Sequence, residues 1–221
     1  MYGALIAGAG RLVAAVELYD ISIEVRRGML AWPTGRPAAV HRVVDQGTAA
    51  EPRNSEWTLD SHAGTHVDAP LHFLPAAGDV ETIPLQACLG PCQILEVEGQ
   101  EIDASSLRAD SLQSGARLLF KTENSRRRIS RVEFDPEFAA ISVEAAQRIA
   151  AAGVALVGVD YLSVESSRGT GDVHRILLEA GVVLLESLDL SAVEPGGYNL
   201  CALPLRLSGG EASPVRAVLW R

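Results

Sequence analysis

The sequence predicts a mixed α/β or α+β fold built as a single domain. Its length of 221 residues is enough to bury one sizeable hydrophobic core. Short apolar runs typical of strands are mixed with capped segments typical of helices, without the strict alternation of a βαβ protein. No internal repeat, low-complexity tract or linker divides the chain. One α/β or α+β domain is therefore expected.

The strand prediction rests on short apolar or alternating runs bounded by turn residues. These runs lie at residues 19–25, 55–68, 93–97, 118–121, 154–159 and 182–185. Residues 29–37 are broken by Pro and Gly and are expected to form a loop. The tail from residue 200 to residue 220, with a Gly-Gly pair at its centre, has the pattern of a hairpin.

Helices are predicted where a capping residue precedes a helical pattern and a glycine ends it. The predicted helices, each with its cap and stop, are residues 104–113 (Asp103, Gly115), 143–152 (Ser142, Gly153) and 173–180 (Asp172, Gly181). Strand 182–185 follows the last helix directly and ends at Glu186.

Composition narrows the classes of function. Hydrophobic residues make up 48% of the chain, which favours a compact protein over a disordered one. The formal charge of -9 argues against nucleic acid or an anionic membrane as a partner, and leaves a small-molecule substrate. The odd set of cysteines (Cys88, Cys92 and Cys201) shows no disulfide framework and favours a reducing cytoplasm.

The first eighteen residues, 1–18, are apolar and small, and we interpret them as an N-terminal extension or small packing helix. Arg11 interrupts the apolar stretch, whereas a signal peptide has its basic residues before it. The stretch is also short of the roughly 20 apolar residues that a transmembrane helix needs.

Residues 61–73, S-H-A-G-T-H-V-D-A-P-L-H-F, are the most informative segment of the chain. They hold His62, His66 and His72, which are three of the five histidines of the protein, together with Asp68. Imidazole and carboxylate are ligands that suit zinc, manganese and iron. The segment predicts a metal site, and the absence of nearby cysteine makes an inert structural zinc site less attractive.

The spacing indicates a bent strand. His66 and Asp68 share a face of a strand, because side chains alternate. His62 would then lie about 13 Å from His66 at ~3.3 Å per residue, near the limit of joint ligation. Gly64 permits a bend between them, and Pro70 disfavours continuation as a helix. His72, beyond Pro70, could complete the ligand shell or transfer protons, and we favour proton transfer.

A second histidine and carboxylate are predicted to face this cluster. His174 lies in the first turn of the last predicted helix, and residue 180 ends that helix about 9 Å further on at ~1.5 Å per residue. The following strand returns about 16 Å at ~3.3 Å per residue. Glu186 therefore comes back at least to the level of His174. An unpaired carboxylate at the end of an apolar strand is costly to bury, which favours a functional role.

These residues match a known family. The motif H-x-G-T-H-x-D-x-P-x-H is met by His62, Gly64, Thr65, His66, Asp68, Pro70 and His72, and further family blocks match residues 158–164, 174–181, 186–190, 202–207 and 213–217. The chain from residue 19 onward resembles the cyclase family of metal-dependent hydrolases, whose best-known members are bacterial kynurenine formamidases. The resemblance implies a swivelling β/β/α domain over residues 19–221, in a homodimer or homotetramer.

The resemblance also implies roles for the matched residues. His62, His66 and Asp68 would hold a first divalent metal, and Asp68, His174 and Glu186 a second. His72 would be the catalytic general acid/base. Zinc is the expected metal, in one or two ions, with manganese as the alternative. A bound divalent metal lowers the pKa of water toward ~7 and polarises a carbonyl, which suits hydrolysis of an acyl C–N bond.

The expected substrate is an aryl formamide such as N-formylkynurenine, an intermediate of tryptophan catabolism. A ring-opening hydrolase of lactams or lactones, as in isatin hydrolases, and a polyketide-type cyclase are the alternatives within enzymes. A metal-binding protein without turnover is the alternative from another class. Segments 122–136 and 166–173 differ from kynurenine formamidases and are expected near the substrate, with aromatic candidates at Trp32, Trp57, Phe73 and Tyr161.

Overall fold

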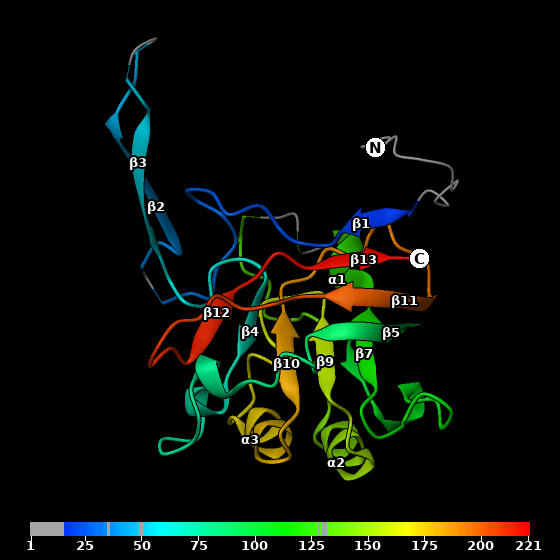
Figure 1. The fold of residues 1–221 in the computed structure, drawn as a ribbon. Helices are drawn as coiled ribbons and strands as arrows, with labels where there is room; N and C mark the ends of the chain where they lie inside the picture. Colours follow the sequence, from blue (N-terminus) through cyan, green and yellow to red (C-terminus); the bar gives the residue numbers. More distant parts are fainter. Residues whose placement is uncertain (1–15, 35, 49–50, 128, 130–131) are drawn as a thin grey trace, which may run out of the picture.

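A curled, mixed β-sheet organises the molecule. The computed structural model describes residues 16–34, 36–48, 51–127, 129 and 132–221. The strands are β1 (Leu18–Asp20), β2 (Ala39–Asp45), β3 (Asn54–Leu59), β4 (His66–Asp68), β5 (Leu89–Glu96), β6 (Glu101–Ile102), β7 (Arg117–Lys121), β8 (Ala140–Ile141), β9 (Leu156–Val159), β10 (Val183–Glu186), β11 (Gly196–Cys201), β12 (Ala212–Pro214) and β13 (Val218–Trp220). Nine of them form one sheet in the order β1-β13-β11-β5-β7-β9-β10-β4-β12 (Figure 1).

The centre of this sheet is parallel and its flanks are antiparallel. Strands β5, β7, β9 and β10 are parallel neighbours. On one flank β4 pairs antiparallel with both β10 and β12. On the other, β11, β13 and β1 add antiparallel strands that curl over the sheet (Figure 1). The small sheets β2-β3 and β6-β8 stand apart from it.

Helices cover one face of the sheet. The α-helices are α1 (Glu123–Arg127), α2 (Val143–Ala152) and α3 (Asp172–Glu179), and single 3₁₀ turns lie at Pro70–His72, Val80–Thr82 and Ala104–Ser106. Helices α2 and α3 lie side by side beneath the central strands (Figure 1). The mixture of helices and strands confirms the predicted fold class.

The alternation of side chains along the strands divides the interior into two cores. In β7, Leu118 and Phe120 pack with the helices, whereas Leu119 packs in the core on the opposite face. In β10, Leu184 lies on the helix side and Leu185 on the opposite side. Strands β7 and β10 are therefore buried on both faces, which explains their apolar runs at residues 118–120 and 183–185.

Helix α2 begins and ends where the sequence predicts. The Ser142 side chain accepts a hydrogen bond from the Ala145 N–H, and Gly153 adopts the left-handed conformation at φ 69°. A serine N-cap and a glycine after the last turn are common helix boundaries, because each satisfies backbone groups that the helix leaves unpaired.

The predicted helix 104–113 is wrong beyond its first turn. Asp103 does cap residues Ala104–Ser106, but the chain becomes extended at Leu107. The hydroxyls of Ser105 and Ser106 both donate to the same Asp103 carboxylate oxygen. Such local side-chain hydrogen bonds compete with helix propagation.

The start of α3 also differs from the prediction. Gly171, at φ 87°, is the N-cap, and Asp172 is the first helical residue rather than the cap. The Asp172 carboxylate instead accepts a hydrogen bond from the Thr170 hydroxyl at 2.6 Å.

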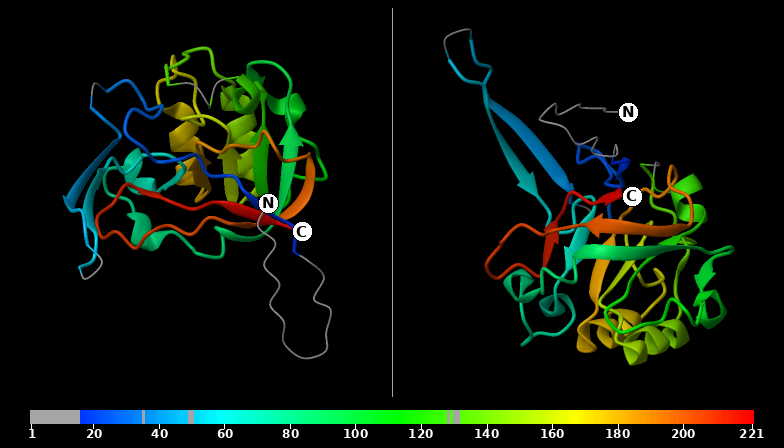
Figure 2. Two further views of the ribbon diagram at one scale, coloured as in Figure 1. Left: turned by 90° about the horizontal axis from the view of Figure 1, so that it is seen from above. Right: turned by 45° about the vertical axis from the view of Figure 1, so that its right-hand side comes forward.

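Residues 55–68 form two strands instead of one bent strand. β3 belongs to a hairpin with β2 that extends away from the main sheet, and β4 lies inside that sheet (Figure 2). The turn between β3 and β4 contains Gly64 at φ 71°, so the predicted bend is confirmed. We call the β2–β3 hairpin the arm.

The start of the chain differs from the prediction as well. Of the predicted strand 19–25, only Tyr19 and Asp20 belong to a regular strand, β1, with a single further bridge at Ser22. Residues 1–15 of the predicted N-terminal extension lie outside the described residues. Among the residues that are described, no helix combines the length and apolarity needed to cross a membrane.

Gly158 provides a test of the close packing between β9 and its neighbours. A Cβ at Gly158 would lie 2.4 Å from Leu119 Cδ2 and 2.9 Å from Leu188 Cδ1, and both leucines are fully buried. Gly158→Ala is expected to lower the free energy of unfolding by about 1–3 kcal/mol, as overpacking does. Gly197→Ala in β11 is the matched control, because its Cβ would meet only Gln93 Oε1 at 3.7 Å. Urea unfolding of both variants checks this, and equal stabilities would contradict it.

Candidate metal centre

The pairing of β4 with β10 brings the first candidate ligands together. His66 lies opposite Glu186 in the antiparallel register, and Asp68 lies opposite Leu184. Because Val67 packs in the core on the side away from the helices, His66 and Asp68 point to the helix side of the sheet. Glu186 shares that side with Leu184, and all three polar side chains are buried.

The conformation of His66 is fixed by its own turn. Its Nδ1 lies 2.8 Å from the Gly64 carbonyl oxygen, so Nδ1 carries the proton and donates it. Nε2 is then left to face the carboxylates, at 3.3 Å from Glu186 Oε2 and 3.5 Å from Asp68 Oδ1. A Cβ at Gly64 would lie 2.9 Å from Val25 Cγ2, so the turn also lacks space for a side chain.

A strained residue ties this turn to the end of β10. Ser187, directly after Glu186, has φ 61°, and it is the only non-glycine residue with a positive φ in the described part of the chain. Its carbonyl accepts a hydrogen bond from the Thr65 hydroxyl at 2.5 Å, and its N–H donates to the Tyr161 carbonyl at 2.7 Å. Such strain costs on the order of 1–3 kcal/mol and persists only where surrounding contacts enforce it.

His174 joins the cluster from α3, as the sequence predicts. Its Nε2 lies 3.6 Å from Glu186 Oε1, so the strand after α3 does return to the level of the histidine. The same oxygen, Glu186 Oε1, accepts a hydrogen bond from the Val164 N–H at 2.7 Å. Glu186 therefore lies between His66 and His174.

His62 and His72 complete the cluster on its open side. His62 Nδ1 lies 3.2 Å from Asp68 Oδ1, and its ring centroid is 4.3 Å from that of His72. The His72 ring is 5.9 Å from the His174 ring, so His72 lies between the two halves of the site. All six predicted site residues are thus brought together by the fold.

Unpartnered buried atoms show that the donor set fits a metal. His66 Nε2 and both carboxylate oxygens of Asp68 are buried without a hydrogen-bond partner. One set of ligand atoms from His66, Asp68 and Glu186, and another from His62, Asp68 and His72, lie within 4.8 Å of one another. Buried polar atoms without partners are costly, and imidazole and carboxylate suit zinc and manganese. Asp68 is common to both sets, although the sets combine the other residues differently from the two ligand groups that the family resemblance implies.

Opposite charges buried side by side shift the pKa values of His66, His174 and Glu186. Burial alone would lower the pKa of His66, but the neighbouring carboxylates of Glu186 and Asp68 raise that pKa to about 9. Burial would also lower the pKa of His174, but the carboxylates of Glu165 and Glu186 outweigh this effect and raise that pKa to about 9. Burial would raise the pKa of Glu186, but the imidazoles of His174 and His66 beside it hold that pKa below its ordinary value. The metal-free cluster therefore holds protons where a cation would bind.

His72 behaves differently from these ligands. Its burial outweighs the attraction of Asp68 and lowers its pKa below the ordinary value. A neutral imidazole at neutral pH can accept a proton, as a general base must.

Two carboxylates of the site were not predicted from the sequence. Glu165 accepts a hydrogen bond from His174 Nδ1 at 2.9 Å, and these contacts lower its pKa although burial opposes this. Glu211 Oε1 lies 2.5 Å from the Ser61 hydroxyl and 3.7 Å from His62 Nε2. Glu165 follows a buried block and precedes a glycine-rich approach to His174, and this position is the signal that could have revealed it.

A cavity of about 620 Å³ opens over the cluster. Trp32 and Phe73, two of the predicted aromatic candidates, line it. Trp57 instead lies on the arm, stacked on His41 with ring centroids 4.3 Å apart, and Tyr161 is fully buried against Phe138. Segment 166–173 contributes Ser166, Ser167, Gly169 and Gly171 to the wall, as expected, whereas no described residue of segment 122–136 lines this cavity. A cavity of this size fits a small aromatic molecule.

The raised pKa values predict how the stability of the metal-free protein depends on pH. His66 and His174 have pKa values of about 9 when folded, against about 6.5 in an unfolded chain. Their protonation therefore stabilises the fold fully below pH ~6.5, and this contribution is lost as pH rises toward 9. Urea unfolding of chelator-stripped wild type and His174→Asn from pH 6 to 10 measures it. The stability difference between them should shrink as pH rises, and a growing difference would contradict the prediction.

Comparison with known proteins shows which family the chain resembles. The family model described as putative cyclase matches residues 19–166. The kynurenine formamidase of Paracidovorax citrulli is 34% identical over 91% of this chain and 95% of its own length. A predicted metal-dependent hydrolase from Bacillus stearothermophilus has the same fold, with a TM-score of 0.81 at 32% identity, covering 94% of this chain and 99% of its own.

A more distant solved structure shows the same fold. Isatin hydrolase A from Ralstonia solanacearum has a TM-score of 0.77 at 20% identity, over 93% of this chain and 92% of its own. These likenesses confirm the fold and the hydrolase class predicted from the sequence. The protein belongs to the cyclase family of metal-dependent hydrolases.

Proposed function

We propose that the protein is a metal-dependent hydrolase that cleaves the acyl C–N bond of an aryl formamide, with N-formylkynurenine-like compounds as substrates. The observation that carries this proposal is the set of buried, unpartnered ligand atoms on His66 and Asp68 beneath an aromatic-lined cavity. The relative from Paracidovorax citrulli supports the substrate class, because it is a kynurenine formamidase.

The ligands divide into two groups around the shared Asp68. His62, His66 and Asp68 would hold one divalent ion, and Asp68, His174 and Glu186 a second. We propose residues 19–221 as the hydrolase domain, zinc as the metal and manganese as its alternative. A set of imidazoles and carboxylates without thiolate suits either ion.

The metal would supply an acidified water and a polarised substrate carbonyl. His72 would do the proton transfers, since its ring faces both halves of the cluster and lines the cavity. An imidazole nitrogen of His72 would accept a proton from the attacking water and then donate it to the departing aryl amine. Phe73 and Trp32 in the cavity wall would hold the aryl ring against this machinery.

Lactam or lactone ring opening is the second candidate reaction, because it breaks an acyl bond with the same groups, and isatin hydrolase A shares the fold. A polyketide-type cyclase and a metal-binding protein without turnover are the remaining candidates. The cavity and the lowered pKa of His72 favour turnover, because a storage site needs neither.

We also propose a cytoplasmic homodimer or homotetramer. All three cysteines are free, which suits a reducing compartment. The arm is a two-stranded sheet that carries exposed Val40, Val44, Trp57 and Leu59. An isolated hairpin is marginally stable and exposed apolar patches mark interfaces, so a second copy of the chain is its proposed partner.

Variants of His66 and His72 separate metal binding from proton transfer. His66→Ala is expected to lose bound zinc and all activity. His72→Ala is expected to retain zinc and lose about 10²–10⁴-fold in kcat, the range typical of a general acid/base. Metal analysis and formamide and lactam assays measure both. The ligand atoms of His72, His62 and Asp68 lie within 4.8 Å of one another, close enough to share a metal ion. Loss of zinc from His72→Ala would therefore show that His72 is a metal ligand and not the acid/base.

A charge on the arm tests the oligomer. Trp57 is 47% exposed and lies in β3 of the arm, which extends away from the main sheet (Figure 2). Trp57→Glu is expected to shift the protein to monomers in sedimentation-velocity experiments, because burying a charge at an interface is costly. Glu56→Gln on the same strand is the control. A wild-type protein that sediments as a monomer would refute the proposed oligomer and leave the proposed metal site untouched.

A further inference from the structure

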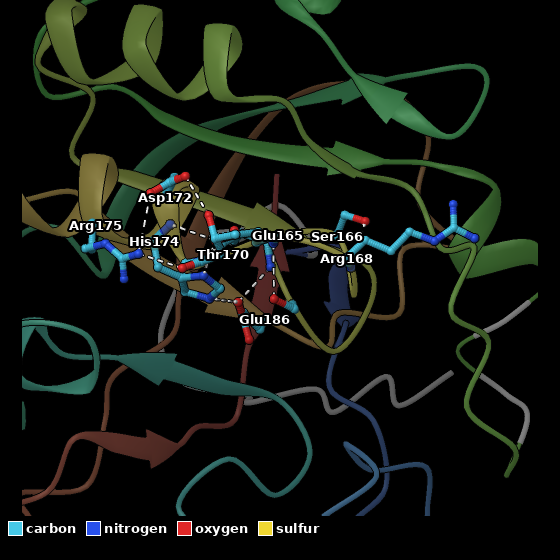
Figure 3. A network of polar contacts seen from close by, with 11 residues as sticks. Glu165, Ser166, Arg168, Thr170, Asp172, His174, Arg175 and Glu186 are labelled. Carbon is cyan, nitrogen blue, oxygen red and sulfur yellow. Dashed lines mark hydrogen bonds and ion pairs between the residues drawn. The ribbon is translucent and has the colours of Figure 1, made fainter.

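Glu165 holds the edge of His174 that faces away from the cluster. Its Oε2 accepts hydrogen bonds from His174 Nδ1 at 2.9 Å and from the His174 backbone N–H at 3.3 Å. Its Oε1 accepts the Gly171 N–H at 2.7 Å. Figure 3 shows His174 between Glu165 on one side and Glu186 on the other. Glu165 is only 6% exposed, so these contacts are shielded from solvent.

We propose that Glu165 is a positioning residue that controls binding of the second metal ion, an inference that rests on the proposed function. A carboxylate can only accept a hydrogen bond from Nδ1 of His174, so it keeps a proton on that nitrogen. Nε2, 3.6 Å from Glu186 Oε1, is then the nitrogen with a free lone pair. Outer carboxylates of this kind orient metal-binding histidines and raise their basicity.

The ring of His174 is constrained from a second direction. Phe73 stacks on it with centroids 4.2 Å apart and planes inclined by 16°. Phe73 therefore fixes the plane of the ring, and Glu165 fixes its rotation within that plane. Together they aim Nε2 at the position shared with Glu186.

The surrounding loop is shaped around the Glu165 carboxylate. A Cβ at Gly169 would lie 2.2 Å from Glu165 Oε1 and 2.5 Å from its Cγ. The loop leaves no space there for any side chain. Gly169→Ala therefore offers a way to displace the carboxylate without changing Glu165 itself.

Glutamine at position 165 separates the tautomer effect from simple packing. Gln has one acceptor oxygen, whereas Glu165 accepts on both oxygens. If its oxygen keeps the Gly171 N–H, its amide faces His174 Nδ1 and moves the proton to Nε2. That proton then occupies the direction of the metal.

Zinc titration of the stripped full-length protein tests the proposal. Wild type is expected to bind two zinc ions. In Glu165→Gln one of the two zinc affinities should fall about 10–100-fold, as outer-carboxylate losses do, with the other unchanged. Gly169→Ala should reproduce this split. Thr170→Val is the control, because the Thr170 hydroxyl in the same loop donates its hydrogen bond to Asp172 and not to Glu165 or His174.

The outcomes distinguish this inference from the proposed function. Wild-type affinity for both ions in Glu165→Gln would overturn it, as would a wild type that binds only one ion, although the hydrolase proposal would survive. Equal loss of both ions together with a lower melting temperature of the metal-free variant would show a merely structural role. A wild type that binds no zinc would refute the proposed function itself.

Discussion

The antiparallel pairing of β4 with β10 is the constraint on which the site depends. It sets His66 opposite Glu186 in a region that excludes water, where neither group is stable alone. The same register turns Val67 and Leu185 toward the opposite core, so that a shift by one residue would bury the ligands in apolar side chains and expose the core to the cavity. Packing and ligand geometry are therefore specified by the same hydrogen bonds.

Electrostatics follow from this arrangement. Glu186 lies between the imidazoles of His66 and His174. Its negative charge raises the pKa of both histidines, and the two imidazoles lower the pKa of Glu186. Protons therefore substitute for the cation in the metal-free state, whereas His72, less favoured by the carboxylates, is left neutral. One cluster thus contains histidines suited to two tasks: His66 and His174 are paired with Glu186, whereas burial dominates at His72.

Much of this could be predicted from sequence, for identifiable reasons. His62, His66, Asp68 and His72 are close in sequence, so their proximity follows from spacing and one glycine bend. Helix α2 was predictable because its serine cap and glycine stop are local signals. His174 and Glu186 could be matched because a helix and a returning strand have fixed rises per residue.

The predictions that failed concern features that contacts outside the local sequence pattern decide. The helix predicted after Asp103 stops because serine hydroxyls bind the capping carboxylate, a competition that helical periodicity does not register. The arm separates from β4 because only tertiary pairing decides which half of residues 55–68 enters the main sheet. Glu165 was missed because its partner lies nine residues away across a loop whose path no local pattern specifies.

The division of the site between regular elements and loops has an evolutionary consequence. His66, Asp68, His174 and Glu186 lie on strands and a helix, whereas Trp32 and the wall residues 162–171 come from connecting segments. Insertions and substitutions accumulate most readily in such connections. The scaffold can therefore acquire new substrates by exchanging these connecting segments, with His66, Asp68, His174 and Glu186 left intact on the regular elements beneath.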